Sequence, residues 1–116
     1  MNTYTATVDH VVDADTLDLD IDLGFGIRVR QRVRLEGLNT PEKNTPDGKA
    51  ASTWVTAWIA DHPHLTVQTH RREKYGRWLA TLTAADGQCL NTALLDAGHA
   101  APYDGSGPRP LPQPKE

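Results

Sequence analysis

The chain has 116 residues, of which 38% are hydrophobic, so it is long enough for one domain with one core and too short for two. No apolar run approaches the length of a membrane span, and the single cysteine, Cys89, rules out an internal disulfide. The formal net charge of −3 argues against a protein that binds nucleic acid through bulk positive charge.

The first third of the chain predicts three strands. Residues 3–12 are rich in β-branched and aromatic residues, and residues 17–23 alternate leucine or isoleucine with aspartate. Glycines at positions 24 and 26 indicate a hairpin loop, and residues 27–35 alternate again, with arginines on one face. If the two alternating strands pair, three aspartates face three arginines: Asp18, Asp20 and Asp22 with Arg28, Arg30 and Arg32. We assign these arginines to cross-strand charge pairing.

The rest of the chain predicts a helix, two strands and a second helix. Apolar residues recur at helical spacing over residues 50–61, and short strands follow at 65–69 and 78–83. The last helix covers residues 92–97, with Asn91 as its cap. Three strands, a helix, two strands and a short C-terminal helix predict a mainly β fold with α-helices (α+β). We expect an OB-fold, a five-stranded Greek-key barrel with a helix between strands 3 and 4.

The two ends of the chain carry simpler patterns. Five of the fifteen residues from 102 to 116 are proline, so we expect a domain at 1–101 and a flexible tail at 102–116. Removal of residues 105–116 should then leave fold and activity intact. The first ten residues lack the pattern of a secretory signal, which favours a cytoplasmic protein, with a trimmed secreted form as the alternative.

Residues 34–42 form the stretch with the most chemistry. An arginine ends the third predicted strand, and Asn39, Thr40 and Glu42 follow in a proline-stiffened turn. Amide, carbonyl and carboxylate oxygens suit Ca²⁺, and an arginine beside them suits a phosphate. The stretch alone fits a strand followed by a solvated polar turn equally well.

Four segments together resemble the staphylococcal nuclease (thermonuclease) family over about residues 8–100. They are Val-Val-Asp-Ala-Asp-Thr at 11–16, the turn at 34–42, Lys-Tyr-Gly-Arg at 74–77, and Asp-Gly at 86–87 with Leu-Asn-Thr-Ala-Leu at 90–94. The resemblance implies an OB-fold nuclease that cleaves DNA and RNA phosphodiester bonds with Ca²⁺ and little sequence preference. We expect a monomer with DNA and RNA as substrates and no membrane partner.

The resemblance also implies a metal site. Asp15 matches the main carboxylate ligand, and Thr40 matches the position whose backbone carbonyl binds the metal. Asp13 matches an acidic residue close to the metal. Asn39 stands where many members have a second ligating aspartate, so we expect weak Ca²⁺ binding, roughly 10⁻⁴–10⁻³ M.

The remaining matches concern the substrate. Arg34 and Arg77 match the arginines that hold the scissile phosphate, and Glu42 matches the proposed general base. Lys74 and Tyr75 match positions that contact a neighbouring phosphate. A non-catalytic OB-fold module that binds nucleic acid or protein is the alternative function.

Strand alternation places Asp15 on an apolar face and Arg34 on a polar face. The two side chains can converge only through a bulge or a strong barrel twist, so we expect one of these between them.

Overall fold

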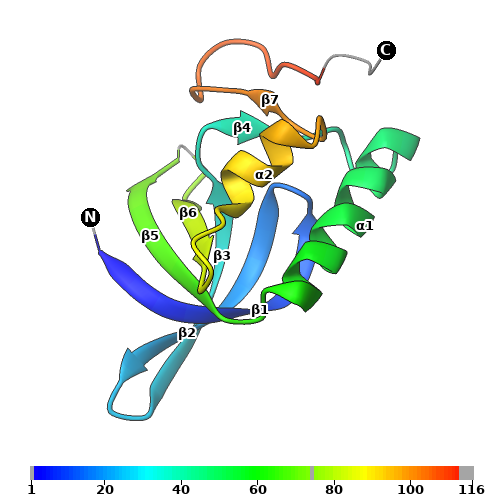
Figure 1. The fold of residues 1–116 in the computed structure, drawn as a ribbon. Coiled ribbons are helices and arrows are strands. Elements are labelled where there is room, and N and C mark those ends of the chain that lie inside the picture. The colour runs from blue at the N-terminus through cyan, green and yellow to red at the C-terminus, as the bar shows by residue number, and fades with distance from the viewer. Residues whose placement is uncertain (1, 74, 113–116) are drawn as a thin grey trace.

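The alternating segments form the strands of a closed barrel in the computed structural model, which describes residues 2–73 and 75–112 (Figure 1). The barrel strands are β1 (Thr3–Asp13), β2 (Thr16–Gly24), β3 (Ile27–Leu35), β5 (Leu65–Arg72) and β6 (Trp78–Ala84). They run around the barrel in the order β1-β2-β3-β6-β5, and β5 pairs with β1 to close it. Only the β3–β6 pair is parallel. The predicted five-stranded α+β barrel is therefore confirmed.

The strand faces separate core from charge, as the alternation requires. Leucines and valines of the strands and helices fill the interior: Leu17, Leu19, Val33, Leu35, Leu38, Val55, Leu65, Val67, Leu82, Leu90 and Leu94. Burial of these side chains is the main force that holds the barrel together.

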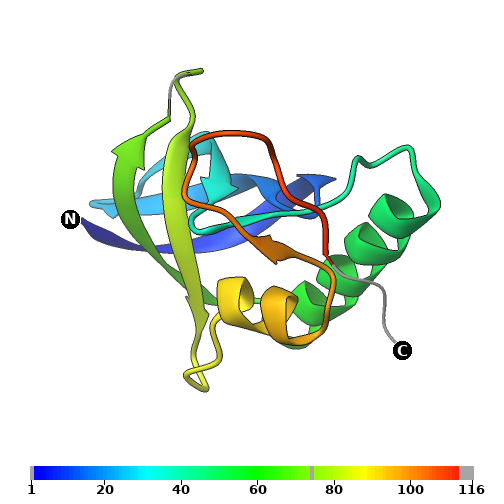
Figure 2. The ribbon, with the colours of Figure 1, turned by 90° about the horizontal axis from the view of Figure 1, so that it is seen from above.

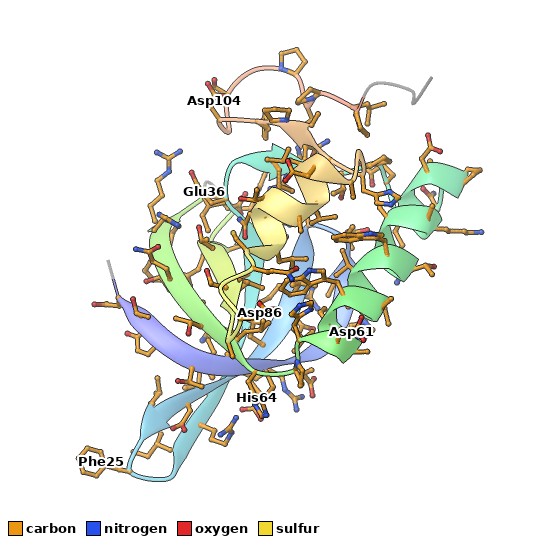
Figure 3. The ribbon with its side chains drawn as sticks, in the orientation of Figure 1. Phe25, Glu36, Asp61, His64, Asp86 and Asp104 are labelled. Atoms are coloured by element: carbon orange, nitrogen blue, oxygen red, sulfur yellow. The ribbon has the colours of Figure 1, made fainter. Side chains whose placement is uncertain are left out.

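The outer face of the β2–β3 hairpin carries the predicted ion pairs. Arg32 Nε lies 2.8 Å from Asp18, and Arg28 Nε lies 3.0 Å from Asp20. Arg30 differs, because its side chain pairs with Asp9 of β1 at 3.4 Å although its backbone lies opposite Asp20. These exposed pairs contribute little to stability, because water and salt screen the charges. The hairpin ends in a loop whose Phe25 points away from the barrel (Figure 3).

Helix α1 (Pro46–Asp61) connects the third and fourth barrel strands, as predicted, but begins four residues earlier than the apolar spacing indicates. The reason is local: Thr45 Oγ1 accepts a hydrogen bond from Gly48 N at 3.0 Å, and Pro46 occupies the first turn. Trp58 of this helix is buried in the core.

The prediction that Asn91 caps the second helix is wrong. Helix α2 (Leu90–Asp96) begins two residues earlier with Cys89 at its N-cap, and Asn91 is buried within the helix. Its Oδ1 accepts from Leu82 N at 3.1 Å, and its Nδ2 donates to the carbonyls of Glu36 and Ala80. Asn91 therefore joins α2 to β6 and to the chain that leaves β3.

A second, two-stranded sheet lies at one end of the barrel. It pairs β4 (Leu38–Asn39) with β7 (Ala101–Pro102), so regular pairing continues one residue past the domain boundary we expected. Residues 103–112 then pass over this end of the barrel (Figure 2). Neither α1 nor α2 of the described chain is both long and apolar enough to cross a membrane.

Candidate active site

The end of β3 and the turn between β1 and β2 meet through the backbone. Leu35 N donates a hydrogen bond to Asp15 O at 2.9 Å, and Thr16 pairs with Arg34 across the two strands. The β1–β2 pairing shifts register between Val11 and Asp13, before Asp15, whereas β2 and β3 pair in regular register beside Thr16 and Arg34. Asp15 itself lies in the turn between β1 and β2, outside the strand alternation, so its side chain can share one end of the barrel with Arg34.

Asp15 and Arg34 form a buried ion pair. Their side chains are each 7% exposed, and Arg34 Nη2 lies 3.4 Å from Asp15 Oδ2 and 3.0 Å from Asn39 Oδ1. Asp15 also accepts from Thr16 Oγ1 at 3.1 Å and from Thr40 N at 3.2 Å. The guanidinium is therefore fixed in place by two oxygens before any ligand arrives.

A cavity of about 50 Å³ opens beside this pair. Three carboxylates and three arginines line it: Asp13, Asp15 and Glu42 with Arg34, Arg77 and Arg109. Burial raises the pKa of the Asp13 carboxyl, and the negative charges of Asp15 and Glu42 raise it further. A cation bound in this cavity would offset the repulsion that Asp13 experiences from these two carboxylates.

The donors at this cavity fit Ca²⁺ by their chemistry. The described residues contain no group of three or more His, Cys, Asp or Glu side chains that could hold a metal by themselves. Ca²⁺ accepts carbonyl, hydroxyl and water oxygens as well, and the cavity also presents Thr40, whose buried hydroxyl lacks a hydrogen-bond partner. Asn39 lines the cavity, but its amide oxygen bonds to Arg34 and its amide nitrogen to Pro110 O at 2.9 Å.

Arg77 approaches the same cavity from the loop before β6. Its Nε lies 3.0 Å from Glu73 Oε1 and its Nη2 lies 3.2 Å from Oε2, a two-bond arrangement. This pairing lowers the pKa of Glu73 and raises the pKa of Arg77. The negative charge of Asp15 also raises the pKa of Arg77. Tyr75 is exposed, and its ring lies 5.9 Å from the Arg77 guanidinium. Lys74, predicted to contact phosphate, lies outside the described residues.

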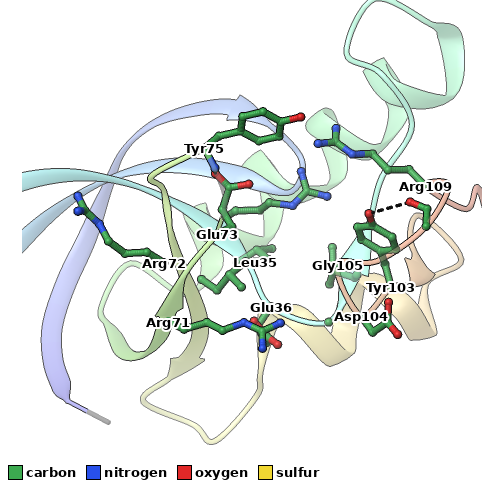
Figure 4. A pocket seen from close by; sticks show the side chains of 15 residues that line it. Leu35, Glu36, Arg71, Arg72, Glu73, Tyr75, Tyr103, Asp104, Gly105 and Arg109 are labelled. Carbon is green, nitrogen blue, oxygen red and sulfur yellow. Dashed lines mark hydrogen bonds between the residues drawn. The ribbon is translucent and has the colours of Figure 1, made fainter.

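A larger cavity of about 350 Å³ adjoins the first and shares Arg34 and Arg109 with it (Figure 4). Tyr75 and Tyr103 face this space from the β5–β6 loop and from the C-terminal segment. Its volume is within the range of small-molecule sites. Charged and aromatic side chains in one recess can accept a phosphate together with a planar ring.

The structure therefore brings together most of the residues singled out from sequence. One cavity is lined by Asp13, Asp15, Arg34, Asn39, Thr40, Glu42 and Arg77. Arg109 also lines it and was missed, because its proline-rich surroundings indicate a segment without stable structure. No short pattern around Arg109 signals its position, which depends on the path of the chain after β7.

Comparison with known proteins agrees with this arrangement. Residues 32–113 match the family described as staphylococcal nuclease homologue. Two curated relatives, from Escherichia coli O157:H7 and Escherichia coli, are each named "uncharacterized endonuclease" and are 29% identical over 94 residues. The match covers 81% of this chain, which spans about 58% of the length of either relative.

Proposed function

The chain belongs to the staphylococcal nuclease homologue family, and on that premise we propose that it is a Ca²⁺-dependent nuclease that hydrolyses DNA and RNA. The observation that carries the proposal is the buried Asp15–Arg34 pair, which meets Glu42 and Arg77 at one cavity. Each of these residue types has a task in phosphodiester hydrolysis.

The two arginines supply positive charge where negative charge develops. Attack on a phosphodiester adds charge to a phosphorus centre that is already anionic, and fixed guanidiniums can stabilise that charge. Arg34 is fixed by Asp15 and Asn39, and Arg77 is fixed by Glu73. Because both are held before substrate binds, little reorganisation is needed during the reaction.

Glu42 is the group best placed to accept a proton from the attacking water. It is exposed on the loop after Thr40, and among residues 2–73 and 75–112 its carboxylate has no hydrogen bond or ion pair. A carboxylate without a competing partner can bind water and take its proton.

Ca²⁺ would be held by Asp15 and the backbone carbonyl of Thr40, with Asp13 and the amide oxygen of Asn39 nearby. When bound, the cation would neutralise charge on the phosphate and polarise it. Its presence would also relieve the repulsion that raises the pKa of Asp13.

The second candidate is a module that binds nucleic acid without cutting it. It is favoured by one observation: both Arg34 and Arg77 already bond to carboxylates, so a substrate phosphate must compete for them. A nuclease should lose turnover when Glu42 is replaced, whereas a binding module should have no turnover to lose.

The discriminating experiment follows plasmid DNA and RNA on gels with millimolar Ca²⁺ or with EDTA. Wild type should cut both substrates only with Ca²⁺, and Glu42→Gln and Arg77→Lys should each lower turnover about a hundredfold. Arg30→Ala is the matched control, because Arg30 pairs with Asp9 on the outer face, away from the cavity. Wild type that binds a labelled oligonucleotide but cuts neither substrate would establish the binding module instead.

A further inference from the structure

The C-terminal segment is tied to the candidate site by a series of hydrogen bonds. Tyr103 N donates to Gly37 O at 2.9 Å, directly after the β4–β7 pair. Asp104 Oδ1 then accepts from Ser106 N and Oγ at 2.9 and 2.7 Å, which turns the chain back. Asn39 Nδ2 donates to Pro110 O at 2.9 Å and so fixes the returning chain beside Arg34.

This path delivers Arg109 to the point where the two cavities adjoin. Arg109 lines both the 50 Å³ cavity and the 350 Å³ cavity. Figure 4 shows its side chain reaching from the C-terminal segment across the larger cavity toward Tyr75, with Tyr103 on its own side.

Arg109 differs from the other two arginines of the cavity in its pairing. Arg34 bonds to Asp15 and Asn39, and Arg77 bonds to Glu73. Within the described part of the chain, the Arg109 side chain has no ion pair and no hydrogen bond, and the residue is exposed. It can therefore form charge-assisted bonds to a phosphate without breaking an existing bond.

We propose that Arg109 is a third phosphate-binding arginine, which contacts the backbone of the nucleic-acid substrate where the two cavities adjoin. The proposal rests on the proposed function, since it assigns a further contact to the same substrate. Pro108 and Pro110 flank Arg109, and the ring of each proline fixes its own φ angle. The segment therefore loses less conformational entropy when it binds a ligand. Because Arg109 is exposed and no ion pair or hydrogen bond among the described residues fixes its guanidinium, we assign it to substrate binding rather than to the chemical step.

The test measures binding and turnover separately. Arg109→Ala should weaken binding of a short labelled single-stranded DNA about tenfold, by fluorescence anisotropy in EDTA, and should raise KM similarly. It should leave kcat within about threefold, as expected for a contact made equally before and during the reaction. The slope of log Kd against log salt should fall by about 0.7, the loss of one phosphate contact to a single strand.

Two variants accompany it. Arg109→Lys keeps the charge and should recover most of the affinity, and Arg30→Ala should match wild type in every readout. An unchanged Kd and KM for Arg109→Ala, in a wild type that cuts nucleic acid, would overturn this inference alone. Tighter binding or faster cleavage would also overturn it, since the segment would then obstruct the site. A wild type that neither binds nor cuts would remove the proposed function and this inference with it.

Discussion

Asn39→Asp changes the amide that links Arg34 to the C-terminal segment. In the wild type its Oδ1 accepts from Arg34 at 3.0 Å and its Nδ2 donates to Pro110 O at 2.9 Å. A carboxylate keeps the first bond, but it cannot donate to Pro110 and places negative charge against that carbonyl oxygen. It also adds charge to a cavity that already holds Asp13 and Asp15.

These changes have opposite consequences with and without metal. In EDTA, loss of one partly buried hydrogen bond should cost about 1 kcal/mol, and added repulsion increases this. The Tm should therefore fall by roughly 4 °C or more for a domain of this size. With Ca²⁺, the added charge should lower the Kd about tenfold, about 1.4 kcal/mol, because affinity follows the charge of the ligands.

Thermal unfolding in EDTA and over a Ca²⁺ titration measures both effects on one sample, and calorimetry gives the Kd directly. We expect Asn39→Asp to melt below wild type in EDTA and to recover stability as Ca²⁺ saturates. Asn39→Ala is the control, since it loses both bonds, gains no charge and should melt lower in both conditions. If Asn39→Asp leaves the Ca²⁺ midpoint unchanged, residue 39 does not face the metal and the reasoning is refuted.

Three other substitutions address separate parts of the structure. Arg34→Ala leaves Asp15 buried without its cation and should lower the free energy of unfolding, measured in urea, by about 3–5 kcal/mol. Arg34→Lys should regain much of this stability but little turnover. An alanine variant as stable as wild type would contradict the buried pair. Asn91→Ala removes three hydrogen bonds to the backbone, although Ala80 O keeps its bond from Glu36 N, and should cost about 3 kcal/mol; a loss near zero would mean that water replaces the amide. The Arg77 pair lowers the pKa of Glu73 below 4.5, so it adds stability above that pH and loses it as pH falls through the folded pKa. Glu73→Gln should accordingly be less stable than wild type at pH 7 but equal to it in strong acid, and a difference that persists in acid would exclude the ion pair as its cause.

Local patterns predicted the barrel well. Strict alternation in β2 and β3 identified both strands and the charged outer face of the hairpin. It did not show that Leu23 and Ile27 at the hairpin tip are exposed or that Arg34 at the end of β3 is buried. The helix start was misplaced because the apolar spacing begins at Ala51, whereas the helix begins at Pro46, four residues before the predicted start at position 50.

Long-range contacts were beyond the reach of such patterns. Asn91 resembles a helix cap in sequence, yet its amide bonds to two segments far away in the chain. Arg109 is similar, since proline content describes only local backbone preference and says nothing of the bond between Asn39 and Pro110. Deletion of residues 105–116 would remove Pro110, which accepts the hydrogen bond from Asn39, and Arg109, which lines the cavity.

The pairing between β3 and β6 includes Arg34, which holds the phosphate in our proposal. β2 and β3 pair along nearly their whole length, but β3 meets β6 only through Val33, Arg34 and Leu35. This short seam joins segments more than forty residues apart through three residue pairs, so we expect it to open before the longer β2–β3 pairing does. Cleavage activity should thus vanish when the seam frays, before the rest of the barrel unfolds. Amide exchange at Leu79 and Ala80 would report the same opening of the seam, so the proposed activity and the exchange rates should change together.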